Sequence, residues 1–245
     1  RNDIRARYAG STLGLAWLVF YPILFLSAYA IIFQFVYKVR PAVGFDGPYD
    51  YLAMIFCGLI SFIGFSEALT LGVGSVTGNA NLIKNTLFPI ELIPVKAVFT
   101  SQCTQIVGTL LLFVALAAMH KLTWYALMFP VIWALQIMLS IGLVWILASL
   151  NVFLRDLQNI VALLVLVIMM VSPISYTEDM IPPGYRPFLA INPMYYLIIS
   201  YQDCLTLGRF PRGNIFWTLL ILAPTIFLIG YWFFSRMKRV FADNV

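Results

Sequence analysis

Residues 51–103 decide the fold, because two long apolar stretches there are separated by Asn79-Ala-Asn-Leu-Ile-Lys-Asn-Thr-Leu-Phe-Pro-Ile-Glu-Leu-Ile-Pro94. The first apolar stretch, 51–75, contains one acidic residue, Glu67. The segment 79–94 is too polar to lie within lipid and too apolar for an ordinary loop. We therefore expect a small amphipathic helix at the membrane surface, with an apolar face against which another protein can dock.

The composition is that of a membrane protein. Of the 245 residues, 62% are hydrophobic and 10% are charged, and the mean hydropathy is +0.93. These values lie outside the range of a soluble domain of this length. Uncharged runs occur at 8–37, 97–119, 122–154, 157–177 and 213–235. These runs and 51–75 each reach the roughly 20 residues that cross a bilayer as a helix, and lipid cannot satisfy an open strand edge. The sequence predicts an all-α polytopic protein with six spans at 14–37, 51–75, 97–119, 124–150, 157–175 and 213–235.

A seventh uncharged stretch, 187–202, is not expected to cross the membrane. It is short and has the helix breaker Asn192-Pro193 in its middle. With six spans and both termini in the cytoplasm, the Lys and Arg residues divide 9 inside against 6 outside, as positively charged cytoplasmic loops require. Seven spans give 8 against 7. The inner set is Arg1, Arg5, Arg7, Lys84, Lys96, Arg155, Arg236, Lys238 and Arg239; the outer set is Lys38, Arg40, Lys121, Arg186, Arg209 and Arg212.

The segment 176–211 is therefore interpreted as two short helices that dip into the outer half of the membrane. Backbone at that depth is tolerated where protein or a water-filled cavity covers it, so this outer gate segment is expected to line an exit. Residues 1–13 are expected to form a basic interfacial helix. No apolar run is expected to be a cleaved signal, since such runs continue along the chain. Because the chain begins at Arg1, we expect a short piece to precede it.

Enzyme signatures are absent from the sequence. It contains no G-x-x-x-x-G-K-[ST] phosphate loop, so we expect no nucleotide hydrolysis by this chain itself. Cys57, Cys103 and Cys204 lack metal-site spacing and are interpreted as apolar packing residues. His120 is interpreted as a turn residue. One His and ten scattered acids make no catalytic or metal-binding set, and a secondary transporter's paired broken helices are not evident.

An aromatic side chain recurs every four residues in the first span. The series is Trp17, Tyr21, Phe25, Tyr29, Phe33 and Tyr37. One interpretation is an interfacial belt with the middle rings facing lipid or neighbouring helices. The other is a ladder that lines a wide path, on which the C–H faces of sugar rings could stack weakly and slide. Tyrosines of the outer segment, including Tyr176 and Tyr195, favour the second interpretation.

Four segments together resemble the permease subunit of bacterial ABC exporters of lipid-linked polysaccharides, namely the O-antigen, teichoic acid and capsule exporters. The segments are Arg1-Asn-Asp-Ile-Arg-Ala-Arg-Tyr-Ala-Gly-Ser-Thr-Leu-Gly-Leu-Ala-Trp17, Asn81-Leu-Ile-Lys-Asn-Thr-Leu-Phe-Pro-Ile90, Asn151-Val-Phe-Leu-Arg-Asp-Leu-Gln-Asn-Ile160, and Ser172-Pro-Ile-Ser-Tyr176 with Ile191-Asn-Pro-Met-Tyr195. They resemble the opening segment, the coupling helix, the second cytoplasmic loop and the outer gate of that family. The resemblance covers essentially the whole chain.

The resemblance implies a homodimer in the bacterial inner membrane, with the path between its two copies. It implies two copies of a separate ATPase subunit, which would bind ATP and Mg, so no cofactor or metal is expected on this chain. The substrate would be a polysaccharide on an undecaprenyl diphosphate type of carrier lipid. A permease of a drug or small-molecule exporter of the same superfamily is the alternative. An ungated channel or an integral membrane enzyme is a further alternative.

The resemblance gives the segment 79–94 the role of coupling helix. Its expected contacts with the ATPase are Leu82, Ile83, Lys84, Leu87, Phe88 and Pro89. The apolar members could fill a groove or could merely lie in the headgroup layer, with Lys84 and Glu91 at the rim. Pro89 and Pro94 are expected to stop this helix.

Charged residues elsewhere have two interpretations each. Arg5 and Arg7 could hold the carrier diphosphate, since Arg grips phosphate well, or could contact lipid phosphate and fix topology. Arg155 and Asp156 in the second cytoplasmic loop could brace helix ends or touch the ATPase. Glu67 is expected to face the path or the dimer seam, because an ionised carboxylate facing lipid is costly.

Overall fold

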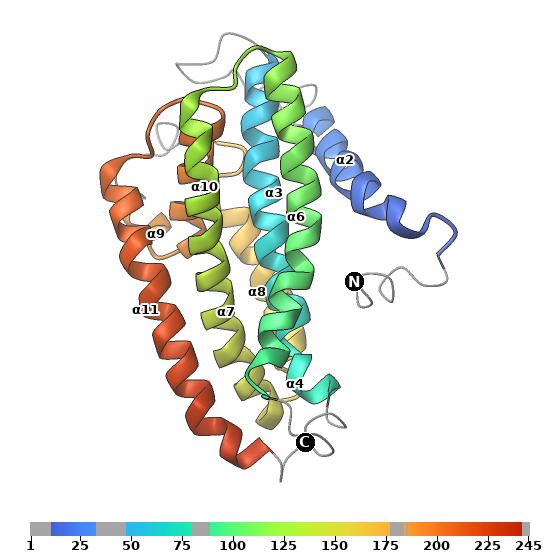
Figure 1. Cartoon of the computed structure of the whole chain (residues 1–245), viewed down its shortest axis with the longest axis vertical. Helices are drawn as coiled ribbons and strands as arrows, with labels where there is room; N and C mark the ends of the chain where they lie inside the picture. Colours follow the sequence, from blue (N-terminus) through green and yellow to red (C-terminus); the bar gives the residue numbers. More distant parts are fainter. Residues whose placement is uncertain (1–10, 33–47, 80–88, 177–183, 185, 242–245) are drawn as a thin grey trace. The chain divides into compact units, whose positions relative to one another are not determined.

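The structure is a computed structural model that describes residues 11–32, 48–79, 89–176, 184 and 186–241. Among these residues the regular structure is helical and no strand occurs, which confirms the all-α prediction (Figure 1). The helices are η1 (Gly14–Ala16), α2 (Trp17–Ala30), α3 (Pro48–Val73), α4 (Ser75–Gly78), α6 (Leu92–Ala118), η3 (Trp124–Met128), α7 (Phe129–Phe153), α8 (Leu157–Val171), α9 (Arg186–Leu189), α10 (Pro193–Leu205), α11 (Gly213–Met237) and η6 (Lys238–Val240).

Four helical stretches are long and apolar enough to cross a membrane. They are Tyr49–Val73, Leu92–Ala118, Trp124–Phe153 and Gly213–Val240. Two other predicted spans correspond to the shorter helices α2 and α8, which have 14 and 15 residues; the predicted span 14–37 continues into residues outside the described ranges. The described part of the outer gate segment contains α9 and α10. The count of six spans stays a prediction.

The start of α6 differs from the expectation for Pro94. Pro94 does not stop the preceding segment but lies in the first turn of α6, which begins at Leu92. Pro is favourable there because the N–H groups of a first helical turn have no partner within the helix. A single turn leads in, with the main-chain N–H groups of Leu92 and Ile93 donating to the carbonyls of Pro89 and Ile90. The span predicted from 97 therefore begins earlier.

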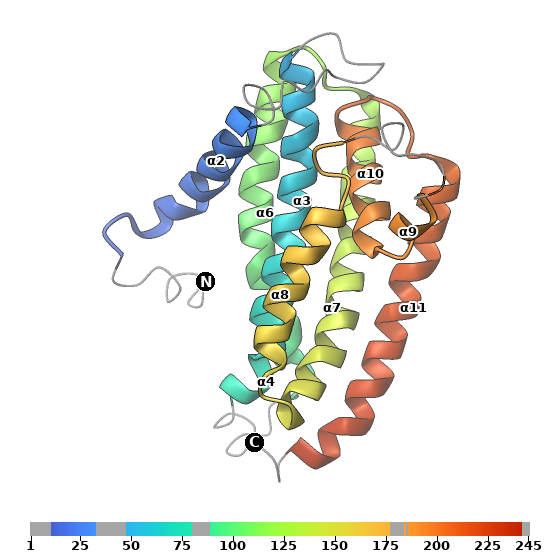
Figure 2. The same ribbon diagram turned by 180° about the vertical axis from the view of Figure 1, so that it is seen from behind.

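The chain divides into two compact units. The first comprises Arg1–Ile63, Cys103–Ile132 and Val171–Phe216, and the second comprises Gly64–Gln102, Trp133–Met170 and Trp217–Val245. The helices α3, α6, α7 and α11 each contribute residues to both units. Figure 2 shows these helices from the side opposite to Figure 1.

The first unit is built around α10. Eleven of its 13 residues are buried, although α10 is too short to be a candidate span. Its neighbours approach closely, since a Cβ atom on Gly58 of α3 would lie 3.3 Å from Cα of Ile174 and 3.4 Å from Cγ2 of Ile198. The ring of Phe129 lies 5.6 Å from that of Tyr201 in α10. Protein therefore covers this short helix, which is the condition that re-entrant backbone must meet.

The second unit is held together by close helix contacts. A Cβ atom on Gly72 of α3 would lie 2.3 Å from Val144 of α7, and one on Gly230 of α11 would lie 2.2 Å from the carbonyl oxygen of Gly142 in α7. Small residues allow such approaches between membrane helices. Polar side chains add hydrogen bonds at the contact of α6 with α3 and α7, where the side-chain oxygen of Gln102 accepts from the Trp133 indole at 2.9 Å.

Candidate functional site

The chain enters α2 through a tight turn. Gly14 has φ +50°, a left-handed conformation that favours glycine. The indole N–H of Trp17 donates to the hydroxyl of Ser11 at 3.1 Å, so the first aromatic residue of the series is bonded to the turn that precedes it. This turn belongs to the opening segment on which the family resemblance rests. Arg5 and Arg7 lie outside the described residues.

Three members of the aromatic series, Tyr21, Phe25 and Tyr29, form a row of rings along α2. The rings of Tyr21 and Phe25 are stacked, with centroids 5.9 Å apart and an interplanar angle of 12°. The rings of Phe25 and Tyr29 are 5.4 Å apart and tilted by 44°. Tyr21 is 45% exposed, so this row is open for contact on at least part of its length. Phe33 and Tyr37 lie outside the described residues, and the path role of the row stays a prediction.

The coupling segment itself falls largely outside the described residues. Leu82, Ile83, Lys84, Leu87 and Phe88 belong to that gap, so their contacts with an ATPase stay predictions. Pro89 is described and exposed. The structure describes both ends of the segment, and each end is attached to the second unit by side-chain hydrogen bonds.

The first attachment joins α4 to the end of α7. The side-chain amide of Asn151 donates to the hydroxyl of Thr77 at 3.2 Å, and Asn79 donates to the carbonyl of Ser75 at 2.8 Å. A Cβ atom on Gly74, between α3 and α4, would lie 2.5 Å from the amide nitrogen of Gln158 in α8. The chain that leads into the coupling segment, Gly74 and α4, is therefore packed against both α7 and α8.

The second attachment is at Glu91, directly before α6. Its carboxylate accepts a hydrogen bond from Nζ of Lys238, and its main-chain oxygen accepts from the Trp145 indole at 3.0 Å. Partial burial raises the pKa of Glu91, but the hydrogen bond from Lys238, a main-chain hydrogen bond at Glu91 and the positive charge of Lys238 together outweigh it, so the pKa lies below its ordinary value of 4.5. Glu91 is therefore ionised at neutral pH and fixed to α7 and η6. The prediction that it lies at a rim did not include these partners.

The segment predicted as the second cytoplasmic loop lies between α7 and α8. Arg155 and Asp156 are both exposed, and the main-chain oxygen of Asp156 accepts from the N–H groups of Asn159 and Ile160 in the first turn of α8. Their side-chain roles stay predictions. Glu67 lies in α3 and is partly exposed, and its place at a path or dimer seam also stays a prediction.

The segment that leaves α8 is held by side chains from two sides. Asn192 caps α10 by accepting from the N–H of Met194 at 2.9 Å, and its amide donates to the Ser172 hydroxyl at 2.9 Å. Tyr51 donates to the carbonyl of Ser175 at 2.7 Å, and Gln202 donates to that of Pro173 at 3.1 Å. Non-helical carbonyls are satisfied in this way. The resemblance had joined 172–176 and 191–195 in one outer gate region, and Asn192 bonds directly to Ser172.

Tyr176 and Tyr195, the two path candidates near the outer gate segment, have different surroundings. The Tyr176 hydroxyl donates to the carbonyl of Val171 at 2.5 Å. Tyr195 is 6% exposed and packs with Leu189, Ile199 and Ile215. Tyr195 thus contributes to the core of the first unit, and its contact with a substrate stays a prediction.

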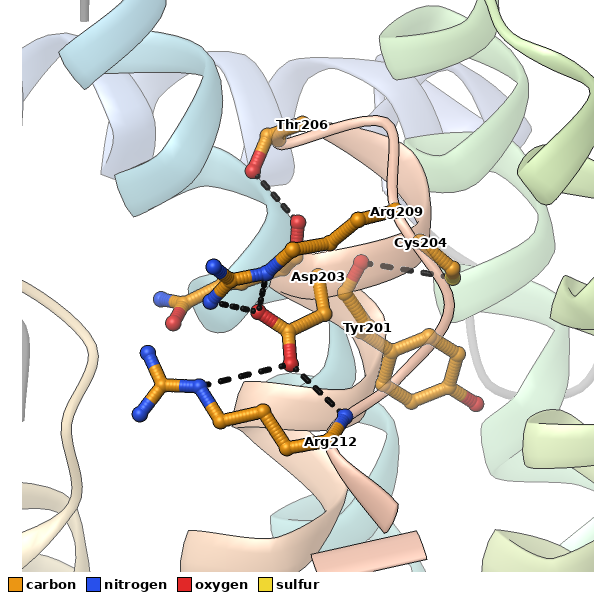
Figure 3. A network of polar contacts seen from close by, with 7 residues as sticks. Tyr201, Asp203, Cys204, Thr206, Arg209 and Arg212 are labelled. Carbon is orange, nitrogen blue, oxygen red and sulfur yellow. Dashed lines mark hydrogen bonds and ion pairs between the residues drawn. The ribbon is translucent and has the colours of Figure 1, made fainter. Parts of the chain in front are cut away.

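A buried acid that the sequence analysis did not single out lies at the end of α10 (Figure 3). Asp203 is 1% exposed. One of its oxygens accepts from Nε and Nη2 of Arg209 at 2.9 and 2.6 Å, and the other accepts from the main-chain N–H of Arg212 at 3.1 Å. The Arg212 guanidinium is 3.8 Å from that second oxygen. The only sequence signal was an acid within an apolar stretch followed by two arginines.

The described residues offer no evident metal site, since no three His, Cys, Asp or Glu side chains come together among them. The long apolar helices are those of a multi-spanning membrane protein. The sequence model of the ABC-2 type transporter family matches residues 1–206, so the chain belongs to that family. The resemblance to ABC exporter permeases is confirmed.

Individual relatives match all or most of the chain. An O-antigen export system permease protein RfbA from Myxococcus xanthus is 28% identical over 248 residues, which cover 100% of this chain and 93% of the relative. A protein of the same name from Klebsiella pneumoniae is 30% identical over 249 residues, which cover 99% and 91%. A polysialic acid transport protein KpsM from Escherichia coli is 22% identical over 222 residues, which cover 86% and 81%.

Proposed function

We propose that this chain is the membrane-spanning subunit of an ATP-driven exporter that moves a lipid-linked polysaccharide, such as an O-antigen, across the bacterial inner membrane. The observation that carries the proposal is full-length similarity, at 28% and 30% identity, to permeases named for O-antigen export. The more distant relative is named for transport of polysialic acid, which is also a polysaccharide. Both names favour a glycan over a drug-sized substrate.

The finer parts of the proposal follow from the family resemblance. The chain forms a homodimer with six spans per copy and cytoplasmic termini, and the path lies between the copies. Two copies of a separate ATPase subunit bind ATP and Mg and dock on the coupling segment. Arg5 and Arg7 meet the diphosphate of the carrier lipid at the inner face, while the row of rings on α2 provides weak stacking sites for the glycan.

The structure supports this proposal in one respect beyond composition. A docking segment can transmit force only if its ends are attached to the helices that must move. Thr77 and Asn151 attach its beginning, and Glu91 attaches its end to Trp145 and Lys238. A segment that merely lay in the headgroup layer would not need both attachments.

The proposal is tested by charging the docking face in a strain that lacks its own copy of the gene. Phe88→Asp should release the ATPase from the purified complex, because an unpaired charge in an apolar groove costs several kcal/mol. Lipid-linked glycan should then accumulate inside the cell and disappear from the surface. Phe88→Leu, which keeps the face apolar, should retain both complex and export. Normal surface glycan in cells without any functional copy of this chain would refute the proposed function.

A further inference from the structure

Glu91 joins three elements at one residue. It is the last residue before α6, its carboxylate bonds to Lys238 at the start of η6, and its main-chain oxygen bonds to Trp145 in the middle of α7. All of these residues belong to the second unit. The end of the coupling segment is thus attached to the ends or middles of three candidate spans.

The ion pair with Lys238 is partly shielded from solvent. The Glu91 side chain is 20% exposed and that of Lys238 is 37% exposed. Charges in such positions are screened less by salt than fully exposed pairs are. The pair also closes a long loop of chain, because 147 positions separate the two residues. It is therefore a specific tertiary contact and not a by-product of one helix surface.

Trp145 extends the contact along α11. Its ring lies 5.0 Å from that of Phe227 and 5.4 Å from that of Tyr231, while Phe234 lies 6.5 Å from Trp145 and 5.3 Å from Phe241. Phe234 and Phe241 are fully buried. A close-packed aromatic cluster deforms little, so a displacement at Glu91 would be passed to α7 and α11 as a body.

We infer that Glu91 is a positioning residue of the transport cycle: its bonds to Lys238 and Trp145 carry the displacement of the coupling segment into α11 and α7. The inference rests on the proposed function, in which an ATPase moves that segment. Lys238 is the receiving residue on the α11 side, and Trp145 is the receiving residue on the α7 side. The pair stays joined through the cycle and moves as one strut.

The two bonds can be separated by mutation. The Trp145 indole donates to the main-chain oxygen of Glu91, so this hydrogen bond does not depend on the Glu91 side chain. Glu91→Gln removes the negative charge of the ion pair with little change of shape. Lys238→Met removes the positive charge of the same pair. Arg239→Gln is the matched control, because it removes a positive charge from an exposed neighbour in the same short helix.

The experiment measures glycan exported per ATP hydrolysed by the complex with its ATPase subunit, together with the yield of that complex. Glu91→Gln and Lys238→Met should each assemble and hydrolyse ATP, but their export per ATP should fall roughly fivefold, the lower end of typical coupling between sites. The combined exchange Glu91→Lys with Lys238→Glu should restore much of the ratio. Arg239→Gln should keep the wild-type ratio.

Two results would overturn the inference while the proposed function stands. One is a wild-type ratio in both single variants. The other is a lower yield of folded complex with an unchanged ratio, which would make the pair structural only.

A second measurement joins Glu91→Cys to Lys238→Cys with a short bifunctional thiol reagent, after the three native cysteines are replaced. The linked protein should regain export, whereas loss of export on linking would show that the pair must separate. Failure of the wild-type complex to export glycan would instead refute the proposed function.

Discussion

At the scale of single residues, one buried charge organises the connection between α10 and α11. The Asp203 carboxylate is almost fully buried, and its arginine partners are 47% and 33% exposed. The carboxylate is thus desolvated far more than the guanidinium groups are. The cost of an unpaired charge therefore falls mainly on the acid, because the arginines can return to solvent.

This asymmetry predicts an unusual order of stabilities. Asp203→Asn should lower the free energy of unfolding by about 1.5–3 kcal/mol, the range for lost hydrogen bonds to a charged group. Arg209→Gln combined with Arg212→Gln should cost more, about 3–5 kcal/mol, because the buried carboxylate then lacks a counter-charge. Thermal unfolding of the purified protein in detergent measures both. Equal losses, or a larger loss for Asp203→Asn, would contradict this account of the loop.

The acids of the membrane region differ in how clearly the sequence marks them. The sequence alone marks Glu67, because this acid interrupts an otherwise uncharged span. Asp203 directly follows the stretch 187–202, which is too short to count as a span, and its partners follow six and nine residues later across a turn. Only the folded loop brings them together. The same holds for Glu91, whose partner is 147 positions away.

At the scale of elements, the contact of α7 with α11 depends on two glycines. A Cβ atom on Gly142 would lie 2.5 Å from the main-chain oxygen of Ile226, and one on Gly230 would lie 2.2 Å from that of Gly142. The obstacles are backbone atoms and not flexible side chains, so neither helix can yield locally. Helices within a membrane associate through such close packing, because the hydrophobic effect does not drive them together there.

Alanine substitution tests this contact. Gly230→Ala should force the helices apart and lower stability by about 1–3 kcal/mol, as overpacking does. Gly78→Ala in α4 is the matched control, since a Cβ atom there meets nothing within 4 Å; the lower entropy of the unfolded chain should make it neutral or stabilising. Thermal unfolding and the yield of monodisperse protein are the measurements. Wild-type unfolding of Gly230→Ala would mean that the two backbones are not in contact.

Hydropathy located the long helices but not all of their ends. Uncharged runs mark α6, α7 and α11, and an apolar stretch interrupted only by Glu67 marks α3, because charge within a span is costly. The span predicted from 97 starts too late because the uncharged run begins only after Lys96, and because Pro94 suggests a stop although proline also begins helices. Distinguishing the two requires knowledge of where the preceding N–H groups bond, and a single sequence does not contain it.

At the scale of the whole molecule, the family and the class of function were predictable because they are spread over many positions. Span pattern, surface segment and four short motifs all follow from the order of residues. The tertiary attachments of the segment were not predictable from the sequence. Thr77 and Asn151 form one polar pair and Glu91 and Lys238 form the other, and the two members of each pair lie far apart along the chain. Such pairs carry no local signature.

The row of rings on α2 gives the prediction most specific to a glycan. Many weak contacts let a long chain slide, whereas one tight site would stall it. Each ring contact is worth about 1 kcal/mol, so Tyr21→Ala or Tyr29→Ala alone should leave most export intact. The combined change of Tyr21, Phe25 and Tyr29 to Ala should abolish export while the protein still inserts and binds its ATPase. Surface glycan against intracellular lipid-linked glycan is the readout.

The matched control for this row lies on the other side of the same helix. Val19, Phe20 and Ile23 are all exposed, and at 3.6 residues per turn they face away from the row. Their triple change to Ala removes a similar apolar surface, including one ring, and should leave export unchanged. If both triple variants export normally, the row serves only packing and membrane anchoring. If Tyr21→Ala alone already stops export, the rings form one selective binding site, and sliding along a ladder is the wrong description of how the glycan moves.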